Sequence, residues 1–224
     1  MKSLLKSAKL LLILSLLTFT LAQNTENEKR TGSTWNFNGN IFSLTLHPVF
    51  CDSNQVLSSF RLIRDGSNMY FRLFCISGLG VLDEQFTQYT EWNGTGGNKV
   101  ESLNFLDRHG LTCPEDSAMN GFQMERSGDS IRFRYNCNRV KLISQSSYTT
   151  DFVRSGIGEA HGFSVHDVKA PDTRFKTQAI KGFRMGARYS NRWCTFLCSD
   201  FQDIRFTINF FVLRNISADN MDSN

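Results

Sequence analysis

The sequence has little proline, no apolar run of membrane-spanning length after its N-terminus, and none of several common catalytic motifs. Only three of the 224 residues are proline, and long helical patterns are scarce. The lack of a later apolar stretch of about 20 residues excludes a transmembrane helix beyond the N-terminal segment. The chain has no G-x-S-x-G elbow, no H-E-x-x-H motif and no phosphate-binding loop, so the enzyme classes defined by those motifs are excluded.

The first 22 residues have the composition of a secretory signal peptide. Three lysines and no acid precede a short apolar run over 10–21, which ends at Ala22. The run is too short to span a bilayer comfortably, and small residues at Thr20 and Ala22 are typical of a cleavage site. We therefore expect residues 1–22 to be removed and the mature chain, starting at Gln23, to be secreted and extracellular.

Removal of this segment also changes the charge. The whole chain has 25 basic and 21 acidic residues, a net charge of +4, and three of its lysines lie in the signal. The mature chain therefore has 22 basic residues against 21 acidic ones. A nearly neutral protein has no overall positive field, so we expect no nucleic-acid partner and no attraction to an anionic membrane.

Cysteines and sequons agree with export. Six cysteines in an exported chain predict disulfide bonds. Two sequons, Asn93-Gly94-Thr95 and Asn215-Ile216-Ser217, predict surface glycosylation at Asn93 and Asn215.

The chain repeats one pattern three times. Residues 51–75 and 113–137 are both 25 residues long, begin and end in cysteine, and place a phenylalanine nine positions after the first cysteine. The segment 178–185 aligns with both and leads to Cys198, while glycines recur 62 residues apart. Landmarks sharing one period predict tandem repeats in a single domain. The predicted divisions are a polar leader 23–31, repeats 32–93, 94–155 and 156–217, and a polar tail 218–224.

Each repeat has the pattern of β-structure. Met69–Cys75 alternates apolar and polar residues, and Asp65–Asn68 and Ser127–Ser130 have the composition of hairpin turns. A strand before each hairpin (41–47, 100–106, 163–168) and one after it would give about four strands per repeat. The sequence therefore predicts an all-β, pseudo-threefold β-prism of three repeats of about 62 residues, with a β-trefoil as the alternative.

Equivalent repeats would pair Cys51 with Cys75 and Cys113 with Cys137. The third repeat differs, because Arg174 replaces its first cysteine and Cys194 lies four residues before Cys198. Four residues of extended strand span about 13 Å, so a bridge between those two cysteines would need a turn. A structural role is favoured for Cys194 over a catalytic thiol, although six cysteines allow fifteen pairings and the sequence does not choose among them.

No group of side chains indicates catalysis or metal binding. His47 and His109 share one repeat position, which favours a structural role at a strand end. The spacing of His161 and His166 does not place both rings on one face of a strand, so no metal site or cofactor is predicted. Acidic residues occupy unmatched repeat positions and mark no catalytic pair: Glu84, Glu91, Asp107, Asp151 and Asp167.

Glycine-rich loops at the repeat junctions are the predicted ligand-binding sites. Glycine allows a ligand to approach the backbone closely, and the polar neighbours can bind hydroxyl-rich ligands. Tyr70 and Trp193 occupy equivalent outward positions, Trp92 adjoins one loop, and Arg132 takes the Tyr70 position in the second repeat. The candidate ligand-binding residues are Thr95, Gly96, Gly97, Asn98, Gly156, Gly158, Glu159, Tyr70 and Trp193.

The cysteine-bounded pattern resembles a known family. A cysteine, a strand containing phenylalanine, a turn and an alternating strand that ends in cysteine are similar to the vitelline membrane outer layer protein I family, whose three repeats form a β-prism. The acidic signature of that family is replaced here by Gly66–Met69 and Gly128–Ile131. Dermatopontin, with its repeated cysteine-bounded strands, is similar too, and its Asp-Arg-x-Trp hallmark is approximated by Asn191–Trp193. Both resemblances imply a non-enzymatic protein of an extracellular coat or matrix, often associated with carbohydrate.

The sequence thus predicts a secreted, non-enzymatic protein that binds glycans or extracellular glycoproteins. One alternative is a structural coat protein that self-associates through apolar outer strands. Another is a hydrolase acting on polysaccharide, which would need two close carboxylates from different repeats.

Overall fold

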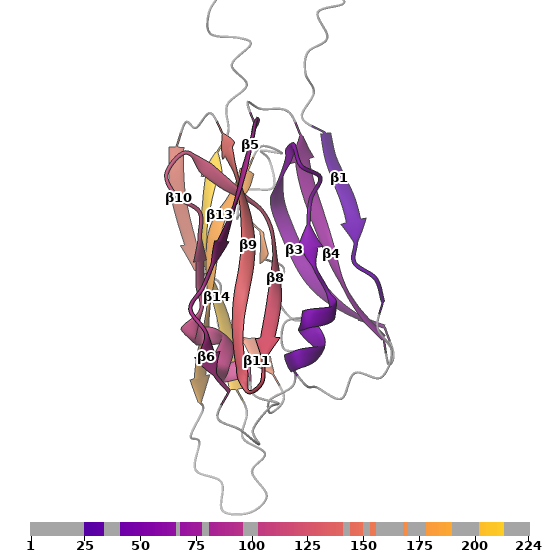
Figure 1. The fold of residues 1–224 in the computed structure, drawn as a ribbon, viewed down its shortest axis with the longest axis vertical. Helices are drawn as coiled ribbons and strands as arrows, with labels where there is room; N and C mark the ends of the chain where they lie inside the picture. The colour runs from indigo at the N-terminus through magenta and orange to yellow at the C-terminus, as the bar shows by residue number, and fades with distance from the viewer. Residues whose placement is uncertain are drawn as a thin grey trace, which may run out of the picture.

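A computed structural model describes residues 25–33, 41–65, 68–77, 81–95, 103–140, 144–149, 153–155, 168–169, 178–189 and 202–212. These residues are mainly strands, with two short 3₁₀ helices, so the chain is all-β as predicted (Figure 1). The strands form three sheets, each built around one long antiparallel hairpin.

The three sheets have the same strand order when the second one is read in reverse: a longer edge strand, the second hairpin strand, the first hairpin strand and a short edge strand. The first sheet has the order β1-β4-β3-β12, with bounds Thr25–Arg30, Asn68–Ser77, Gln55–Asp65 and Val168–Lys169. The second has the order β2-β8-β9-β5, with bounds Val49–Phe50, Ser117–Ser127, Ser130–Val140 and Val81–Tyr89, and β6 (Asn93–Gly94) beside β9. The third has the order β10-β14-β13-β7, with bounds Ser144–Thr149, Gln202–Val212, Gln178–Tyr189 and Gly110–Thr112, and β11 (Val153–Ser155) beside β14.

Short edge strands connect the sheets in a cycle. Strand β2, which precedes the first hairpin, pairs with β8 of the second sheet, and β7, which precedes the second hairpin, pairs with β13 of the third. Strand β12, which precedes the third hairpin, pairs with β3 of the first sheet. Each hairpin therefore receives an edge strand from the segment that leads into another hairpin.

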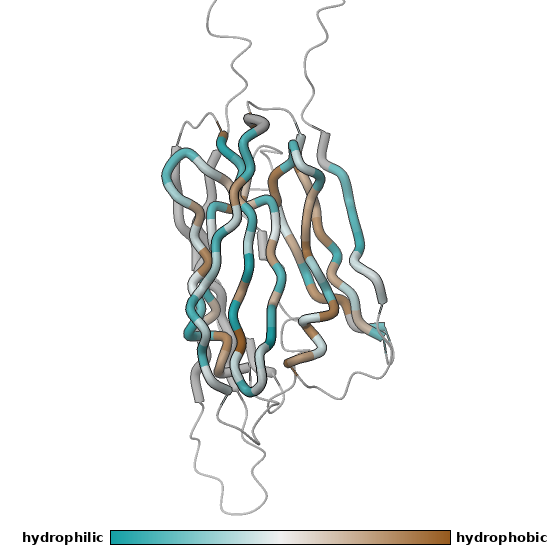
Figure 2. The backbone as a smooth tube through the Cα atoms, viewed as in Figure 1, coloured by the Kyte–Doolittle hydropathy of each residue, from teal (hydrophilic) through white to brown (hydrophobic). Residues whose placement is uncertain are grey.

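The hairpins have the predicted inside–outside alternation. In β4, Met69, Phe71, Leu73 and Cys75 are buried and the intervening residues are partly exposed. Figure 2 shows hydrophobic and hydrophilic stretches succeeding one another along the strands. The predicted turn after β8 is present, and Gly128 has the positive φ of 56° that this turn requires. Residues 66–67 of the first turn lie outside the described residues.

All three hairpins contain an irregularity at a corresponding place. The register shifts between Leu57 and Ser59, between Met119 and Gly121, and between Ile180 and Gly182. A short edge strand pairs with the hairpin at each irregularity, and at Gly121 it lies so close that a Cβ would be 2.1 Å from the Val49 carbonyl oxygen. Gly182 has the same constraint, 2.2 Å from the Leu111 carbonyl oxygen, so these two positions exclude a side chain.

Two predicted strands are 3₁₀ helices instead. The segments 41–47 and 100–106 were expected to be strands, but η1 (Ile41–Leu46) and η2 (Leu103–Arg108) occupy these regions. The reason is visible in η1, where the neighbouring residues Ile41 and Phe42 are both buried, which a strand with one buried face does not allow. The third segment, 163–168, lies almost wholly outside the described residues. Strand β1 lies within the polar leader and was not anticipated.

Phenylalanines from the three hairpins meet in the core. Phe60 of β3, Phe122 of β8 and Phe183 of β13 are buried, with ring centroids 4.9, 5.0 and 5.1 Å apart. The tilted and edge-to-face packing is the arrangement that aromatic rings prefer. One aromatic cluster therefore joins all three sheets.

Two of the predicted disulfide bonds are present. Cys51 bonds to Cys75 and Cys113 bonds to Cys137, each across 24 residues of sequence. Each bond ties the segment before a hairpin to the hairpin's second strand. Cys194 and Cys198 lie outside the described residues.

Candidate functional site

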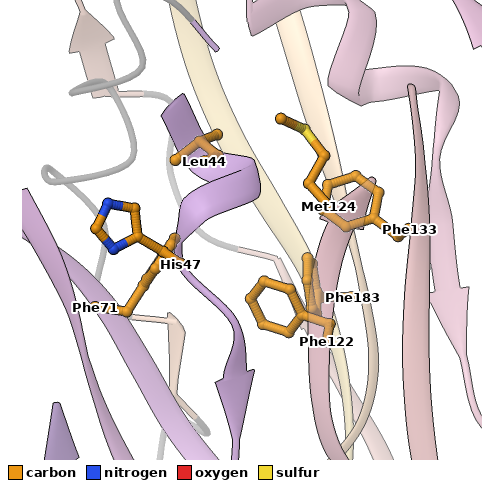
Figure 3. A pocket seen from close by; sticks show the side chains of 7 residues that line it. All are labelled: Leu44, His47, Phe71, Phe122, Met124, Phe133 and Phe183. Carbon is orange, nitrogen blue, oxygen red and sulfur yellow. The ribbon is translucent and has the colours of Figure 1, made fainter. Parts of the chain in front are cut away.

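A small cavity in the core is not a ligand site. Its volume is about 20 Å³, and six of its seven lining residues are apolar (Figure 3): Leu44, His47, Phe71, Phe122, Met124, Phe133 and Phe183. This volume is close to that of one water molecule, and a buried water needs two to four polar partners. The cavity is therefore a packing gap between the sheets.

The two described histidines make the same set of contacts. Nδ1 of His47 lies 3.1 Å from Oγ1 of Thr31, and Nδ1 of His109 lies 2.9 Å from Oγ1 of Thr90. Each threonine hydroxyl also accepts the backbone N–H of a phenylalanine, Phe71 or Phe133, at 2.9 Å. These contacts fasten the chain after β1 and β5 to the neighbouring strand. The two histidines follow 3₁₀ helices rather than strands, and the contacts agree with a shared structural role.

Burial keeps both imidazoles neutral. Desolvation lowers the pKa of His109 to about 4, with a smaller contribution from the adjacent Arg108. Desolvation also lowers the pKa of His47, and a hydrogen bond that the ring donates to the Gly32 backbone partly opposes this. Because both residues are neutral at pH 7, neither supplies an acid for catalysis there.

The structure describes only part of the predicted ligand-binding set. Thr95 is fully buried, and its backbone N–H and its hydroxyl both donate to the Asp129 carbonyl, at 2.7 and 2.8 Å. Tyr70 is partly exposed, and the Arg30 guanidinium lies 5.6 Å from the centre of its ring. The remaining candidates lie outside the described residues: Gly96, Gly97, Asn98, Gly156, Gly158, Glu159 and Trp193. The ligand role of the predicted loops therefore stays a prediction.

The first sequon is partly exposed. Asn93 lies in β6 at the edge of the second sheet, and its side-chain amide donates to the Glu91 carbonyl at 3.3 Å. Asn215 lies outside the described residues. The placement of Asn93 fits the predicted surface position.

An exposed group of aromatic and charged side chains lies on the outer face of the second sheet. Tyr89 is 50% exposed and Trp92 is 41% exposed. The Arg132 guanidinium lies 4.3 Å from the Tyr89 ring centre and 4.4 Å from the nearer Trp92 ring centre, within cation–π range of both. We refer to Tyr89, Trp92, Arg132 and Glu125 as the aromatic–arginine cluster.

Glu125 holds the arginine in place. Its Oε2 accepts from Nε of Arg132 and lies beside Nη2, both at 2.8 Å. Arg134 lies 3.8 Å from the other carboxylate oxygen and donates to Gln123 at 3.0 Å. Two nitrogens of the guanidinium on one carboxylate oxygen hold Arg132 beside both aromatic rings.

The first sheet also has an arginine over a tyrosine ring, but the two residue types lie on the opposite strands. Its tyrosine, Tyr70, is on the hairpin and its arginine, Arg30, is on the edge strand. In the second sheet the tyrosine, Tyr89, is on the edge strand and Arg132 is on the hairpin. Sequence analysis noted Trp92 and Arg132 but missed Tyr89, because its position depends on the pairing of β5 with β9 across some 50 residues. An aromatic residue three positions before Trp92 was the available signal.

Other site types lack support in the residues that the structure describes. These residues contain no group of three or more His, Cys, Asp or Glu side chains that could hold a metal ion. No helix among them has the length and apolarity needed to cross a membrane. The chain matches no protein-family model, no curated protein and no solved structure.

Proposed function

We propose that this protein is a secreted, non-enzymatic, pseudo-threefold β-prism that binds carbohydrate through the aromatic–arginine cluster of its second sheet. The ligand would be a glycan chain, either free or carried by an extracellular glycoprotein. Two disulfides support export, because such bonds persist in oxidising compartments.

Three repeated features support the β-prism. The three sheets share one strand order, their hairpins shift register at corresponding places, and one phenylalanine from each hairpin joins the central cluster. The cyclic pairing of β2, β7 and β12 is what a closed three-sided body requires. Each sheet alone would leave its apolar face uncovered, so the three stabilise one another.

The exposed rings are the observation that carries the proposed function. Two large aromatic side chains stand partly free of the body while Arg132 and Glu125 hold their surroundings rigid. The apolar face of a sugar ring packs on an aromatic ring, and the sugar hydroxyls need donors and acceptors close by. Arg132 can donate and Glu125 can accept at the rim of such a contact. A preorganised surface also loses less side-chain entropy on binding.

The first test compares wild type with Trp92→Ala on immobilised neutral polysaccharides: cellulose, chitin, laminarin and mannan. We expect saturable binding to at least one polymer and an affinity at least about tenfold lower for the variant, since exposed aromatics are typical binding hot spots. Tyr89→Phe keeps the ring and should bind within about twofold of wild type.

Leu46→Ala is the matched control. Leu46 is also exposed, at 63%, and it belongs to η1 and not to the cluster. Equal loss of binding in both alanine variants would contradict the assignment. If wild type binds no polymer, and Trp92→Ala changes the oligomeric state by sedimentation, the cluster is a self-assembly contact of a coat protein instead.

A further inference from the structure

Three arginines form a row across the outer face of the first sheet. Arg30 of β1 pairs in register with Arg72 of β4, and Arg72 pairs on its other side with Arg61 of β3. Directly paired residues of neighbouring antiparallel strands have Cα atoms only about 4.5–5.5 Å apart. Arg30 is exposed, and Arg61 and Arg72 are partly exposed next to the buried residues Phe60 and Leu73, so all three arginines lie on the outer face. We name these three residues the arginine row.

The arginine row is unfavourable for the isolated protein. Like charges placed directly opposite each other destabilise a sheet, and arginine stays protonated under all physiological conditions. Glu28 pairs with Arg30 at 3.1 Å. In the described part of the chain, no carboxylate pairs with Arg72, and its buried Nε has no hydrogen-bond partner. Arg72 therefore contributes a positive charge that no carboxylate of the described residues neutralises.

The corresponding rows of the other two sheets lack this charge. The strand registers place Tyr89, Arg134 and Gln123 in the second sheet's row, and Thr149, Thr207 and Arg184 in the third's. Each of those rows contains one arginine. Since the backbone pattern is shared, the fold does not require three arginines at this position, and the row is specific to the first sheet.

Aromatic side chains border the row on the same strand. Tyr70 and Phe74 lie two residues before and two residues after Arg72 in β4, so all three share the outward face. Arg30 lies over the Tyr70 ring at 5.6 Å, and Arg72 lies 5.7 Å from the Phe74 ring centre. Ring faces beside fixed cations suit a ligand that alternates flat sugar rings with negative groups.

We propose that the outer face of the first sheet is a second binding surface, specific for an acidic polysaccharide that carries sulfate or carboxylate groups. The arginine row would bind the anionic groups through charge-assisted, two-pronged hydrogen bonds, and Tyr70 and Phe74 would contact the sugar rings. This surface lies on a different sheet from the aromatic–arginine cluster. Its binding of acidic polysaccharide can therefore be tested independently of neutral-glycan binding at the cluster.

The test measures the affinity of the oxidised, full mature chain for dextran sulfate and for polygalacturonate, with neutral dextran and single-stranded DNA as reference polymers. We expect binding to at least one acidic polysaccharide and at least about tenfold weaker binding for Arg72→Gln or Arg61→Gln, the usual effect of losing a hydrogen bond to a charged group. The binding constant K should fall with rising salt concentration, and the magnitude of the slope d log K/d log[salt] should decrease by about one for each arginine removed.

Two further variants keep the result interpretable. Arg139→Gln makes the same charge change on the second sheet, where Arg139 pairs with Glu84 at 3.0 Å, and it should bind within about twofold of wild type. Arg72→Lys keeps the positive charge but loses the planar guanidinium that can donate two parallel hydrogen bonds. This variant should therefore retain the salt dependence and lose part of the affinity.

The two acidic polymers distinguish sulfate from carboxylate recognition. Equal weakening by Arg139→Gln, equal affinity for single-stranded DNA, or no binding to either acidic polysaccharide would overturn the proposal. Trp92→Ala should leave this binding intact. Its loss of neutral-glycan binding would be a separate result.

Discussion

At the scale of single residues, His109 connects stability to pH. Its Nδ1 contacts Thr90, while its Nε2 is buried without a hydrogen-bond partner in the described part of the chain. Protonation would place a positive charge in a desolvated position beside Arg108. The folded state therefore resists binding this proton, and the unfolded chain does not.

We expect the free energy of unfolding to fall as the pH drops from about 6.5 to 4. The pKa of His109 is lowered to about 4 in the folded state, so its contribution is complete above the unfolded pKa and is lost as the pH falls through this range. The loss is up to about 3 kcal/mol. Urea unfolding at pH 7.0 and 4.5 measures it.

His109→Gln provides the comparison, because glutamine cannot take up a proton and its carbonyl can accept from Thr90. Burial raises the pKa of Asp107, which gives a slope of opposite sign that is common to both proteins. A variant that loses as much stability on acidification as wild type would show that His109 does not determine the slope.

Some residue roles could be predicted from sequence and others could not. Phe60, Phe122 and Phe183 occupy equivalent positions in the three predicted repeats, and they meet in the core. The arginine row was invisible, because Arg30, Arg61 and Arg72 come together only through the register of β1 and β3 on β4. Register depends on pairing across the fold, which a local pattern does not encode.

At the scale of elements, the close approach of edge strands to hairpins decides which residues are allowed. Strand β2 lies against β8 at Gly121, and β7 lies against β13 at Gly182. In the first sheet the corresponding residue is Ser59, opposite Lys169 of β12. Two of the three connections between sheets therefore depend on glycine for lack of space, rather than for a positive φ.

Gly121→Ala should destabilise the protein by roughly 3 kcal/mol, the upper range for overpacking. The new Cβ would lie 2.1 Å from a carbonyl oxygen and 2.6 Å from the Phe50 Cα, and neither backbone atom can move without disturbing β2. Chemical denaturation measures the difference.

Gly110→Ala is the control, since a Cβ there would contact nothing within 4 Å. This variant should remain within about 0.5 kcal/mol of wild type. Equal stability of the two variants would show that β2 does not pack against Gly121 in solution.

The elements that sequence analysis described wrongly have a common cause. The runs at 41–47 and 100–106 have enough apolar residues for a strand, and in the first of them only the three-dimensional packing shows that the adjacent Ile41 and Phe42 are buried together. The hairpins were easier to predict, because a strict two-residue alternation and a glycine turn specify both strands at once.

At the scale of the whole molecule, the repeat period indicated three similar units, but not which segments would share a sheet. Strand β1 has the polar sequence TENEKR and nothing in it marks a strand, yet it completes the first sheet as β5 completes the second. The cyclic exchange of β2, β7 and β12 is likewise a property of the assembled fold. The meeting of Tyr89, at the end of β5, and of Trp92, between β5 and β6, with Arg132 of β9 depends in the same way on pairing across the fold.

A ¹H–¹⁵N NMR spectrum of the tryptophan indole N–H groups tests the neutral-glycan site most directly. The chain has three tryptophans, and each gives one indole N–H signal. Trp92→Phe identifies the signal of Trp92. Soluble hexaoses of the cellulose, chitin, laminarin and mannan series serve as ligands in turn. We predict that one of them shifts the Trp92 signal saturably and leaves the signals of Trp35 and Trp193 in place. A saturable shift confined to Trp193, or no shift with any oligosaccharide, would contradict binding at the aromatic–arginine cluster.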